Sequence, residues 1–313
     1  MSLSPSGSFN PPPATNTLAI RMMPVVFVGL WSTGFIGAKF GLPYAEPFTL
    51  LLYRMLATLV LVAILIAWYR PTWPSPKAMF HTAVTGLLIH GLYLGGVFYA
   101  IVGEMPAGLV ALIVGLQPLV TALAAVILLR ELVTTRQWLG LMLGLAGVAL
   151  VLLEKMGGAA GIDTSLVSEF PLWTLVWALI ALAGISIGTV YQKRFCQGVE
   201  LIPATFIQYC AAALFFAAGA VMFETGEVEW STQLILAMVW LVLGLSIGAI
   251  LLLMQLIRLG AVSQVASLFY LVPPVTAFEA YLLFDEKLGL LAIAGVVLSV
   301  AGVALVVTKK AVR

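Results

Sequence analysis

Very few side chains in the long apolar segments of this 313-residue chain can carry a charge or a proton, and three are candidates for chemistry. His90 lies near the middle of the apolar segment 79–101, where an imidazole can bind a proton or hydrogen-bond a ligand. Arg54 lies in the segment 47–69, and a guanidinium there can attract a carboxylate. Glu279, in another such segment, can hold a proton or contact an amine. Because ionisable side chains are expensive inside a bilayer, each is a functional candidate.

Each of these three residues also has a structural alternative. His90 can be a neutral histidine that hydrogen-bonds a neighbouring helix. Arg54 can pair with a carboxylate or with backbone carbonyls, and an ion pair with Arg54 is the main alternative for Glu279. His90 and Glu279 are the candidates for coupling to protons.

The other candidates are polar or aromatic residues that could line a central cavity. They are Trp31, Ser32, Tyr93, Tyr99, Gln117, Tyr191, Trp240, Gln255, Gln264 and Tyr270. Some of the aromatic residues have an alternative position at the bilayer boundary, where Trp and Tyr concentrate. Pro118 and the pair Pro273 and Pro274 lie inside apolar segments, and we expect them to bend their helices and leave carbonyls free to line the cavity.

The composition defines the medium in which these residues act. Hydrophobic residues make up 62% of the chain and charged residues 9%, a balance that a water-soluble domain cannot keep off its surface. A helix needs about 20 apolar residues to cross the hydrocarbon core. An all-α integral membrane protein with ten transmembrane helices is therefore predicted, with the helices at 20–39, 47–69, 79–101, 106–129, 135–153, 171–192, 200–222, 233–257, 262–284 and 288–307.

An internal duplication divides these segments into two groups. The residues AGVALV occur at 146–151 and again at 301–306, so a shift of 155 positions (301 minus 146) aligns them. The same shift aligns a further set of residues without a gap, namely Pro118 with Pro273, Thr121 with Thr276, Glu131 with Glu286, Gly140 with Gly295 and Gly147 with Gly302. Glu279 departs from the repeat, because Ala124 occupies the matching position. The chain is therefore predicted to contain two related halves.

We place the two repeats at 18–156 and 171–313, with five predicted helices in each. The segment 157–170 is expected to be the linker between them. Residues 1–17 are rich in Ser, Pro and Asn and contain no charged side chain, so we expect a disordered tail and not a signal peptide.

The basic residues predict the orientation of the helices. If both termini lie on one side, that side carries eleven Lys and Arg residues and the other carries three, namely Lys39, Lys155 and Lys287. This bias predicts cytoplasmic termini, a cytoplasmic tail and an extracytoplasmic linker. Because each half has an odd number of helices, the second half is inverted relative to the first, which is the symmetry of a secondary transporter. One chain holds both halves, so a monomer is mechanically sufficient and a dimer is not excluded.

The sequence resembles the EamA family of the drug/metabolite transporter superfamily over nearly its whole length. The features that carry the resemblance are the first-helix sequence WSTGFIGAKFG, the spacing from Pro47 to Arg54 followed by Ala57, and the repeated glycine-rich helix ending in GVALV. The resemblance implies ten helices in two inverted repeats and the export of small metabolites, amino acids or drugs from bacterial cells. It also implies a central cavity between the first, third, fourth, sixth, eighth and ninth helices, with the fifth and tenth helices peripheral.

These observations together predict a secondary active transporter of the bacterial inner membrane that works by alternating access. The expected substrate is a small amphipathic compound, such as an amino acid or a drug-like molecule. Glu131 and Glu286 precede the fifth and tenth helices, and we interpret them as structural carboxylates at helix N-termini.

The alternatives are an intramembrane serine protease and a non-transporting scaffold or channel. The pattern GxSxG occurs at 184–188 and 244–248, but a serine nucleophile needs a positioned base, and the only histidines are His81 and His90. The soluble hydrolase motif also needs a strand-to-helix turn. The chain has no Walker-type sequence, no ring of like charges, and no Cys/His spacing typical of a metal site. We therefore expect no enzymatic activity, no cofactor or metal, and no nucleic-acid partner.

Overall fold

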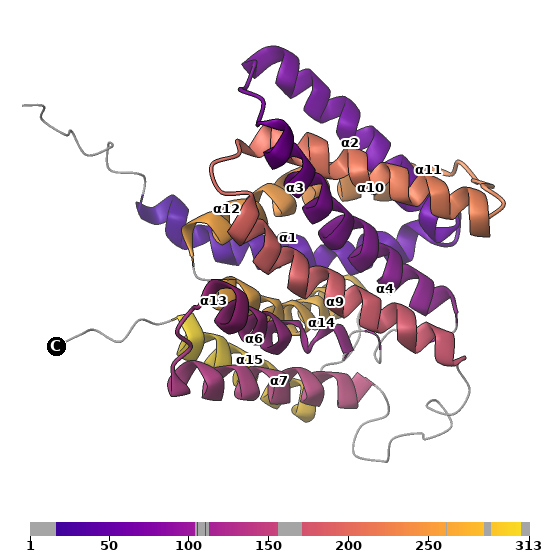
Figure 1. Ribbon diagram of the computed structural model, residues 1–313. Coiled ribbons are helices and arrows are strands. Elements are labelled where there is room, and N and C mark those ends of the chain that lie inside the picture. Colours follow the sequence, from indigo (N-terminus) through magenta and orange to yellow (C-terminus); the bar gives the residue numbers. More distant parts are fainter. Residues whose placement is uncertain are drawn as a thin grey trace, which may run out of the picture.

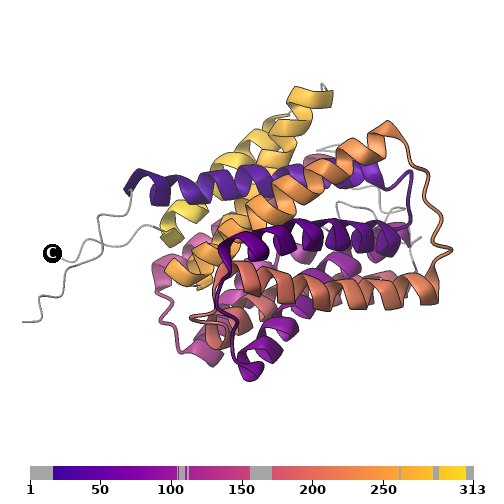
Figure 2. The same cartoon turned by 90° about the horizontal axis from the view of Figure 1, so that it is seen from above.

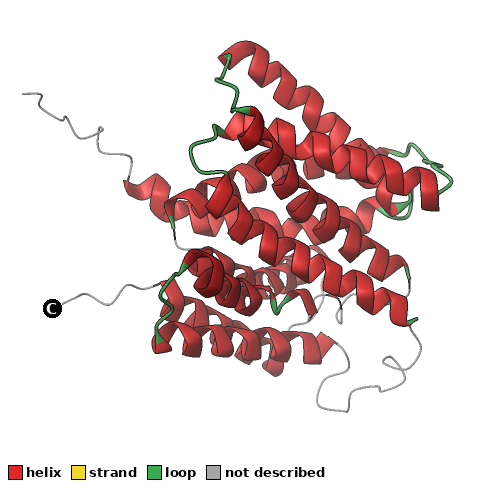
Figure 3. Cartoon of the chain, in the orientation of Figure 1, coloured by secondary structure: helices red, strands yellow, loops and turns green. Residues whose placement is uncertain are grey.

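The computed structural model describes residues 17–103, 105, 110, 113–155, 171–260, 262–284 and 289–307. In this part of the chain every regular element is a helix, and the only strand-type pairing is an isolated bridge between Ala45 and Val228 (Figure 3). The all-helical prediction is therefore confirmed for these residues. The predicted tail, apart from Thr17, and the predicted linker 157–170 lie outside the described residues, as does Glu286.

The described helices follow one another along the chain and pack side by side (Figure 1 and Figure 2). They are α1 (Thr17–Gly41), α2 (Pro47–Tyr69), α3 (Pro76–Gly86), η1 (Leu87–Leu92), α4 (Tyr93–Val102), α6 (Gln117–Leu129), α7 (Thr135–Lys155), α9 (Leu172–Phe195), α10 (Leu201–Phe223), α11 (Thr232–Trp240), η3 (Leu241–Ala249), α12 (Ile250–Leu259), α13 (Val262–Ser267), η4 (Leu268–Leu271), α14 (Val272–Phe284) and α15 (Leu290–Val307). Of these, η1 and η3 are π-helices and η4 is a 3₁₀-helix.

Six of the described helical segments are long and apolar enough to cross a membrane. They span Pro47–Tyr69, Pro76–Val102, Leu172–Phe195, Leu201–Phe223, Thr232–Leu259 and Leu290–Val307. Four shorter apolar helices, Met22–Gly34, Gln117–Leu129, Thr135–Val151 and Val262–Val275, fall within the other predicted transmembrane segments.

The two copies of the repeated sequence meet where α7 packs against α15, along the lower edge of the bundle in Figure 1. A Cβ atom on Gly140 would lie 2.6 Å from the carbonyl oxygen of Gly302, and one on Gly147 would lie 2.5 Å from that of Gly295. Gly140 comes before Gly147 in α7, but its partner Gly302 comes after Gly295 in α15. The two helices therefore run antiparallel. Glycine is required because the two backbones touch.

A second antiparallel pair, α2 and α10, is joined at both ends by equivalent contacts. The carboxylate of Glu46, just before α2, accepts hydrogen bonds of 2.9 Å from the backbone N and the hydroxyl of Thr225, just after α10. Glu200, just before α10, accepts from the hydroxyl and the backbone N of Thr72, just after α2. Glu224 accepts from the free backbone N–H groups that begin α2, at Phe48. These carboxylates therefore fix the register of two long helices.

Glu131 has a different structural role from the one predicted. Its carboxylate accepts from the backbone N of Val262 at 3.0 Å and from the hydroxyl of Ser263 at 3.3 Å. It therefore stabilises the N-terminus of α13, which lies far away in sequence, and not that of the helix it precedes.

The two π-helices occupy matching places in the halves. Segment η1 interrupts the helix between α3 and α4, and η3 interrupts the helix between α11 and α12. Leu87 plus the repeat shift of 155 is position 242, inside η3. A π-turn inserts an extra residue into a helix and is frequent at functional sites. The sequence patterns did not predict either of them.

The three prolines that were expected to bend helices lie next to irregular backbone. Pro118 lies in the first turn of α6, which follows two turn residues, 115–116. Pro273 and Pro274 lie in the first turn of α14, directly after the 3₁₀-helix η4. A proline lacks the backbone N–H, which the first turn of α6 does not use, so Pro118 is accepted there without loss of a hydrogen bond. Pro273 and Pro274 instead lie where the helical run 262–284 changes from 3₁₀ to α geometry.

We expect Gly147→Ala to lower the thermal unfolding midpoint of the purified protein. The added Cβ would lie 2.5 Å from the backbone of Gly295 and Ser299, so the helices must separate, and overpacking of this kind costs about 1–3 kcal/mol. Gly29→Ala is the matched control, because a Cβ on Gly29 has nothing within 4 Å. Equal midpoints for the two variants would contradict the proposed close approach.

Candidate functional site

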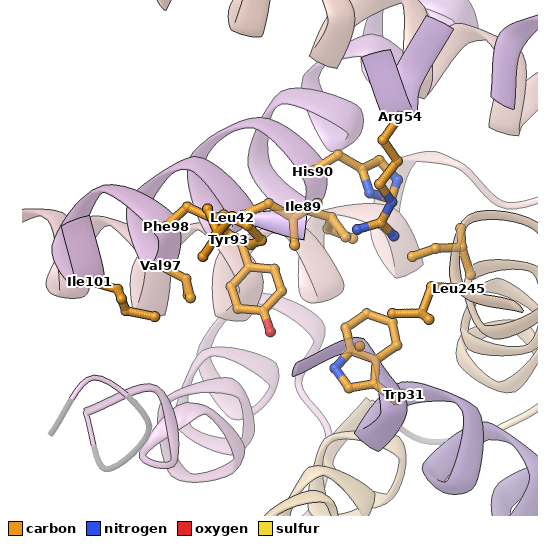
Figure 4. A pocket seen from close by; sticks show the side chains of 13 residues that line it. Trp31, Leu42, Arg54, Ile89, His90, Tyr93, Val97, Phe98, Ile101 and Leu245 are labelled. Carbon is orange, nitrogen blue, oxygen red and sulfur yellow. The ribbon is translucent and has the colours of Figure 1, made fainter. Parts of the chain in front are cut away.

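A cavity of about 320 Å³ lies inside the bundle, between α1, α2, the η1–α4 helix and the η3–α12 helix (Figure 4). This size is at the lower end of that of small-molecule sites. Four of the predicted site residues, Trp31, Arg54, His90 and Tyr93, line it. The other lining residues are Gly34, Leu42, Ile89, Leu94, Val97, Phe98, Ile101, Leu245 and Ile250.

Helical periodicity explains how the third apolar helix forms one wall. His90 lies in η1, and the cavity residues that follow it, Tyr93, Val97 and Ile101, recur every three or four positions along α4. This spacing puts them on one face of the helix. The wall therefore runs from a polar end at His90 to an apolar end at Ile101, as Figure 4 shows.

Arg54 enters the cavity from α2, a helix that the family resemblance did not implicate. It lies on the buried face of α2 together with Leu50, Leu51 and Thr58, and its side chain is only 5% exposed. Its Nε donates a hydrogen bond of 2.9 Å to the hydroxyl of Ser246 in η3. The rest of the guanidinium faces the cavity, next to His90 in Figure 4.

His90 is bonded to a neighbouring helix and also lines the cavity. Its Nε2 lies 3.2 Å from the side-chain Oε1 of Gln208 on α10, and its ring centroid is 4.6 Å from that of Tyr209. The hydroxyl of Tyr209 donates to the backbone oxygen of Ser246 at 3.2 Å. The polar end of the cavity is therefore held by a contact network from α2, η1, α10 and η3.

Three members of this network, Gln208, Tyr209 and Ser246, were not among the predicted site residues. Sequence reasoning could have found Tyr209. The sequences from Pro47 and from Pro203 share Pro, Thr and Tyr at equal spacing, which aligns Tyr209 with Tyr53. Gln208 is an amide in an apolar segment, as Gln117 is. Ser246 is the serine of the second GxSxG pattern, and its hydroxyl accepts the hydrogen bond from Arg54.

The aromatic residues form the side wall of the cavity. Trp31 and Tyr93 are stacked, with ring centroids 6.5 Å apart and an interplanar angle of 19°. Trp31 is held from behind by Phe27 and Phe269, at 5.3 Å and 5.2 Å. Aromatic rings packed in this way present rigid apolar surface to a ligand.

Glu279 and Ser32 do not line the cavity. The hydroxyl of Ser32 donates a hydrogen bond of 2.6 Å to Glu279 Oε1, which joins α1 to α14. Glu279 Oε2 is buried and has no hydrogen-bond partner among the described residues. Glu279 and Arg54 do not form the ion pair that was the alternative from the sequence, since they bind Ser32 and Ser246 respectively.

The other predicted aromatic residues have packing or hydrogen-bonding roles elsewhere. Tyr99 stacks on Phe48 with centroids 4.5 Å apart. The hydroxyl of Tyr191 lies 2.6 Å from His81 Nδ1. Trp240, which is 44% exposed, donates to a threonine hydroxyl on α1 at 2.9 Å.

The remaining candidates are also outside the cavity lining. Tyr270 is fully buried, and its ring would lie 2.5 Å from a Cβ on Gly144. Gln117 is buried and donates to Thr121 Oγ1 at 3.3 Å. Gln255 and Gln264 are partly exposed and do not line the cavity.

The geometry does not assemble a serine–histidine pair from the described residues. Ser246 accepts from Arg54, and the Ser186 hydroxyl is buried without a hydrogen-bond partner in the described part of the chain. The histidine nitrogens instead contact Tyr191 and Gln208. The same residues contain no group of three or more His, Cys, Asp or Glu side chains that could hold a metal ion.

Several proteins are similar in sequence to this chain. The uncharacterized transporter YvbV of Bacillus subtilis is 27% identical over 308 residues, which cover 95% of this chain and 93% of YvbV. The WAT1-related chloroplastic protein At3g02690 of Arabidopsis thaliana is 26% identical over 88% of this chain and 66% of its own length. The uncharacterized inner membrane transporter YedA of Escherichia coli K12 is 25% identical over 79% of this chain and 76% of YedA.

A solved crystal structure with 21% sequence identity has a TM-score of 0.76 over 93% of this chain and 96% of that one, which shows that the two share a fold. The family model for EamA-like transporters matches this sequence twice, over residues 20–153 and 172–308. These matches cover most of the chain and include all six helices that are long and apolar enough to span a membrane. The chain therefore belongs to the EamA-like transporter family and is a multi-pass integral membrane protein.

Proposed function

We propose that this protein is a secondary active transporter that exports small amphipathic metabolites across the bacterial inner membrane. The cavity is the observation that carries the proposal. It lies between apolar helices, has a volume of about 320 Å³, and combines two polar residues, Arg54 and His90, with aromatic and aliphatic walls. A site of this kind can bind a small molecule through one polar end and an apolar body.

The proposed mechanism is alternating access between two inverted five-helix repeats, 18–156 and 171–313. Reciprocal contacts support the inversion. Gly140 touches Gly302 and Gly147 touches Gly295. The shift of 155 instead aligns Gly140 with Gly295 and Gly147 with Gly302. A two-fold axis between inverted halves produces this pattern. Two such halves can exchange conformations and so reverse the side to which the cavity opens.

The orientation with cytoplasmic termini has support from the clustering of basic residues. Arg258 donates to the backbone oxygen of Val199, Arg194 donates to that of Leu128, and Lys193 donates to that of Gly260. These contacts bring the connections after α6, α9 and α12 to one end of the bundle. Helix α1 begins and α15 ends on the same side, at the left of Figure 1. The positive-inside rule favours the cytoplasm for that end.

The π-helices suggest which elements move. Both η1 and η3 contribute residues to the cavity, His90 from the first and Leu245 from the second. Irregular turns inside a helix are points where hydrogen bonding can rearrange at low cost. We propose that they let the cavity walls change shape during transport, with His90 and Glu279 as the proton-coupling residues.

The transport site is tested by filling the cavity. A thermal-shift screen against amino acids, nucleobases, vitamins and cationic dyes first identifies a ligand, because a ligand that binds the folded state raises its apparent stability. We expect Val97→Trp, which puts an indole into the cavity, to reduce exchange of that ligand in proteoliposomes by at least about tenfold. The control is Ile64→Trp, on the exposed face of α2. Exchange that survives Val97→Trp would place the transport path elsewhere.

Inversion is tested by cysteine labelling in intact cells. Pro43 follows the first helix of the first half, and Gln197 follows the first helix of the second half; both are exposed. We expect a membrane-impermeant maleimide to label Pro43→Cys from outside and Gln197→Cys only after permeabilisation. The unsubstituted protein, in which Cys196 is buried, gives the background. Labelling of both positions from the same side would contradict inverted repeats.

Proton coupling is tested by counterflow of the same ligand with and without a pH gradient. We expect the gradient to accelerate exchange by the unsubstituted protein, and Glu279→Gln or His90→Ala to abolish that acceleration. Gln264→Ala, outside the cavity lining, is the control. If neither the gradient nor the two substitutions changes exchange, the coupling proposal fails and the transport proposal remains.

A further inference from the structure

Arg54 is the most unusual group in the cavity, because a buried guanidinium normally has a carboxylate partner. The side chain is 95% buried, given its 5% exposure. A guanidinium has five N–H donors. The described residues accept one of them, from Nε to the Ser246 hydroxyl at 2.9 Å. No carboxylate of the described chain pairs with this charge.

The unused donors of Arg54 are available to a ligand. Arg54 lines the cavity, and Figure 4 shows its guanidinium pointing into the open space. The two terminal nitrogens of a guanidinium match the two oxygens of a carboxylate, and such bidentate pairs are the strongest hydrogen bonds of their kind. The protein therefore supplies a cation at one end of the cavity, and the missing anion can come from the ligand.

The rest of the cavity limits what can accompany that anion. From Tyr93 the lining continues through Val97 and Phe98 to Ile101, with Trp31 stacked against Tyr93. These side chains offer apolar and aromatic surface, which suits a compact ring or a branched hydrocarbon. Arg54 is the one permanently charged residue that lines the described cavity, so a large polyanion would leave its other charges unpaired.

An ammonium group on the ligand would have no counter-ion in this lining. Glu279 was a candidate amine contact from the sequence, but its carboxylate accepts a hydrogen bond from Ser32 and does not line the cavity. His90 is held by Gln208 and shares the cavity end with the Arg54 cation. Burial of an unpaired cation next to another cation is unfavourable.

We propose that the substrate class of this site is a monocarboxylic acid with an apolar or aromatic body and no amino group, bound through its carboxylate to Arg54. This proposal rests on the transporter function proposed above and narrows its substrate from amphipathic compounds in general. It predicts a preference for the acid over the corresponding amino acid, amide and amine.

The test uses four compounds with one shared body: 3-phenylpropionate, 3-phenylpropionamide, phenylalanine and 3-phenylpropylamine. Each is added at millimolar concentration to the purified full-length protein, and the shift of the thermal unfolding midpoint gives its apparent affinity. We expect 3-phenylpropionate to bind at least about tenfold more tightly than the other three compounds. The amide and the amine lack the carboxylate that pairs with Arg54, and in phenylalanine the ammonium group opposes that pairing.

Variants then assign the preference to Arg54. Arg54→Gln should remove the preference for the acid, while Arg54→Lys, which keeps the charge but lacks the fork, should weaken acid binding and keep the preference. The matched control is Arg194→Gln, an exposed arginine at the end of the bundle, which should leave the acid preference intact. If Arg54→Gln does not fold, the comparison of the four compounds on the unsubstituted protein still decides the question.

The outcomes separate this proposal from the transport function. An acid-specific shift without exchange of radiolabelled 3-phenylpropionate in proteoliposomes would support the carboxylate site and contradict transport. Exchange of phenylalanine or the amine in preference to the acid would support transport and overturn the carboxylate proposal. No shift with the acid, or an acid preference that survives Arg54→Gln, would also overturn it.

Discussion

A helix in a bilayer satisfies its own backbone, but its ends and its polar side chains need partners elsewhere in the molecule. Several long-range contacts of this chain meet that need at helix ends. Glu46, Glu200 and Glu224 bind the ends of α2 and α10, and Glu131 binds the start of α13. Lys193 donates to the backbone oxygens of Arg258 and Gly260 at the C-terminal end of α12. With the ends fixed in this way, the interior can be mainly apolar.

The polar end of the cavity is one of the places where this rule is only partly met. Arg54 has one hydroxyl partner inside the protein, and the Gln208 amide nitrogen is buried without one among the described residues. Polar groups left incompletely satisfied cost stability, so they persist where a function requires them. Their hydrogen-bond partners Ser246 and His90 lie in irregular helix, since Ser246 belongs to the π-helix η3 and His90 to the π-helix η1.

The scaffold is nearly symmetric, whereas the cavity is not. The repeated glycines make reciprocal contacts where α7 meets α15, and glutamates at matching positions join α2 to α10. By contrast, aligning Pro47 with Pro203, a shift of 156, puts Cys210 at the position of Arg54, and the shift of 155 puts Leu245 at the position of His90. In a chain with two related halves, the same packing contact can stabilise both halves. A ligand with one charged end, by contrast, needs a charged partner at one end of the cavity only.

Local patterns were enough to predict the membrane setting and the all-helical fold of the described residues, because hydrophobicity and length decide which segments leave water. The patterns could not predict the π-helices, since a single inserted residue leaves hydropathy unchanged. They also put Pro118 inside a helix that in fact begins there, because the preceding turn has no distinctive composition.

Among the site candidates, the sequence by itself determined which side chains are chemically able to bind a ligand in an apolar medium. Only the tertiary structure decided which of them share a cavity: it brought Arg54, His90, Trp31 and Tyr93 together and turned Tyr99, Gln117 and Tyr270 to packing contacts. The reason is that every transmembrane helix has several faces of similar hydrophobicity, so only contacts with other helices select the face that lines the cavity.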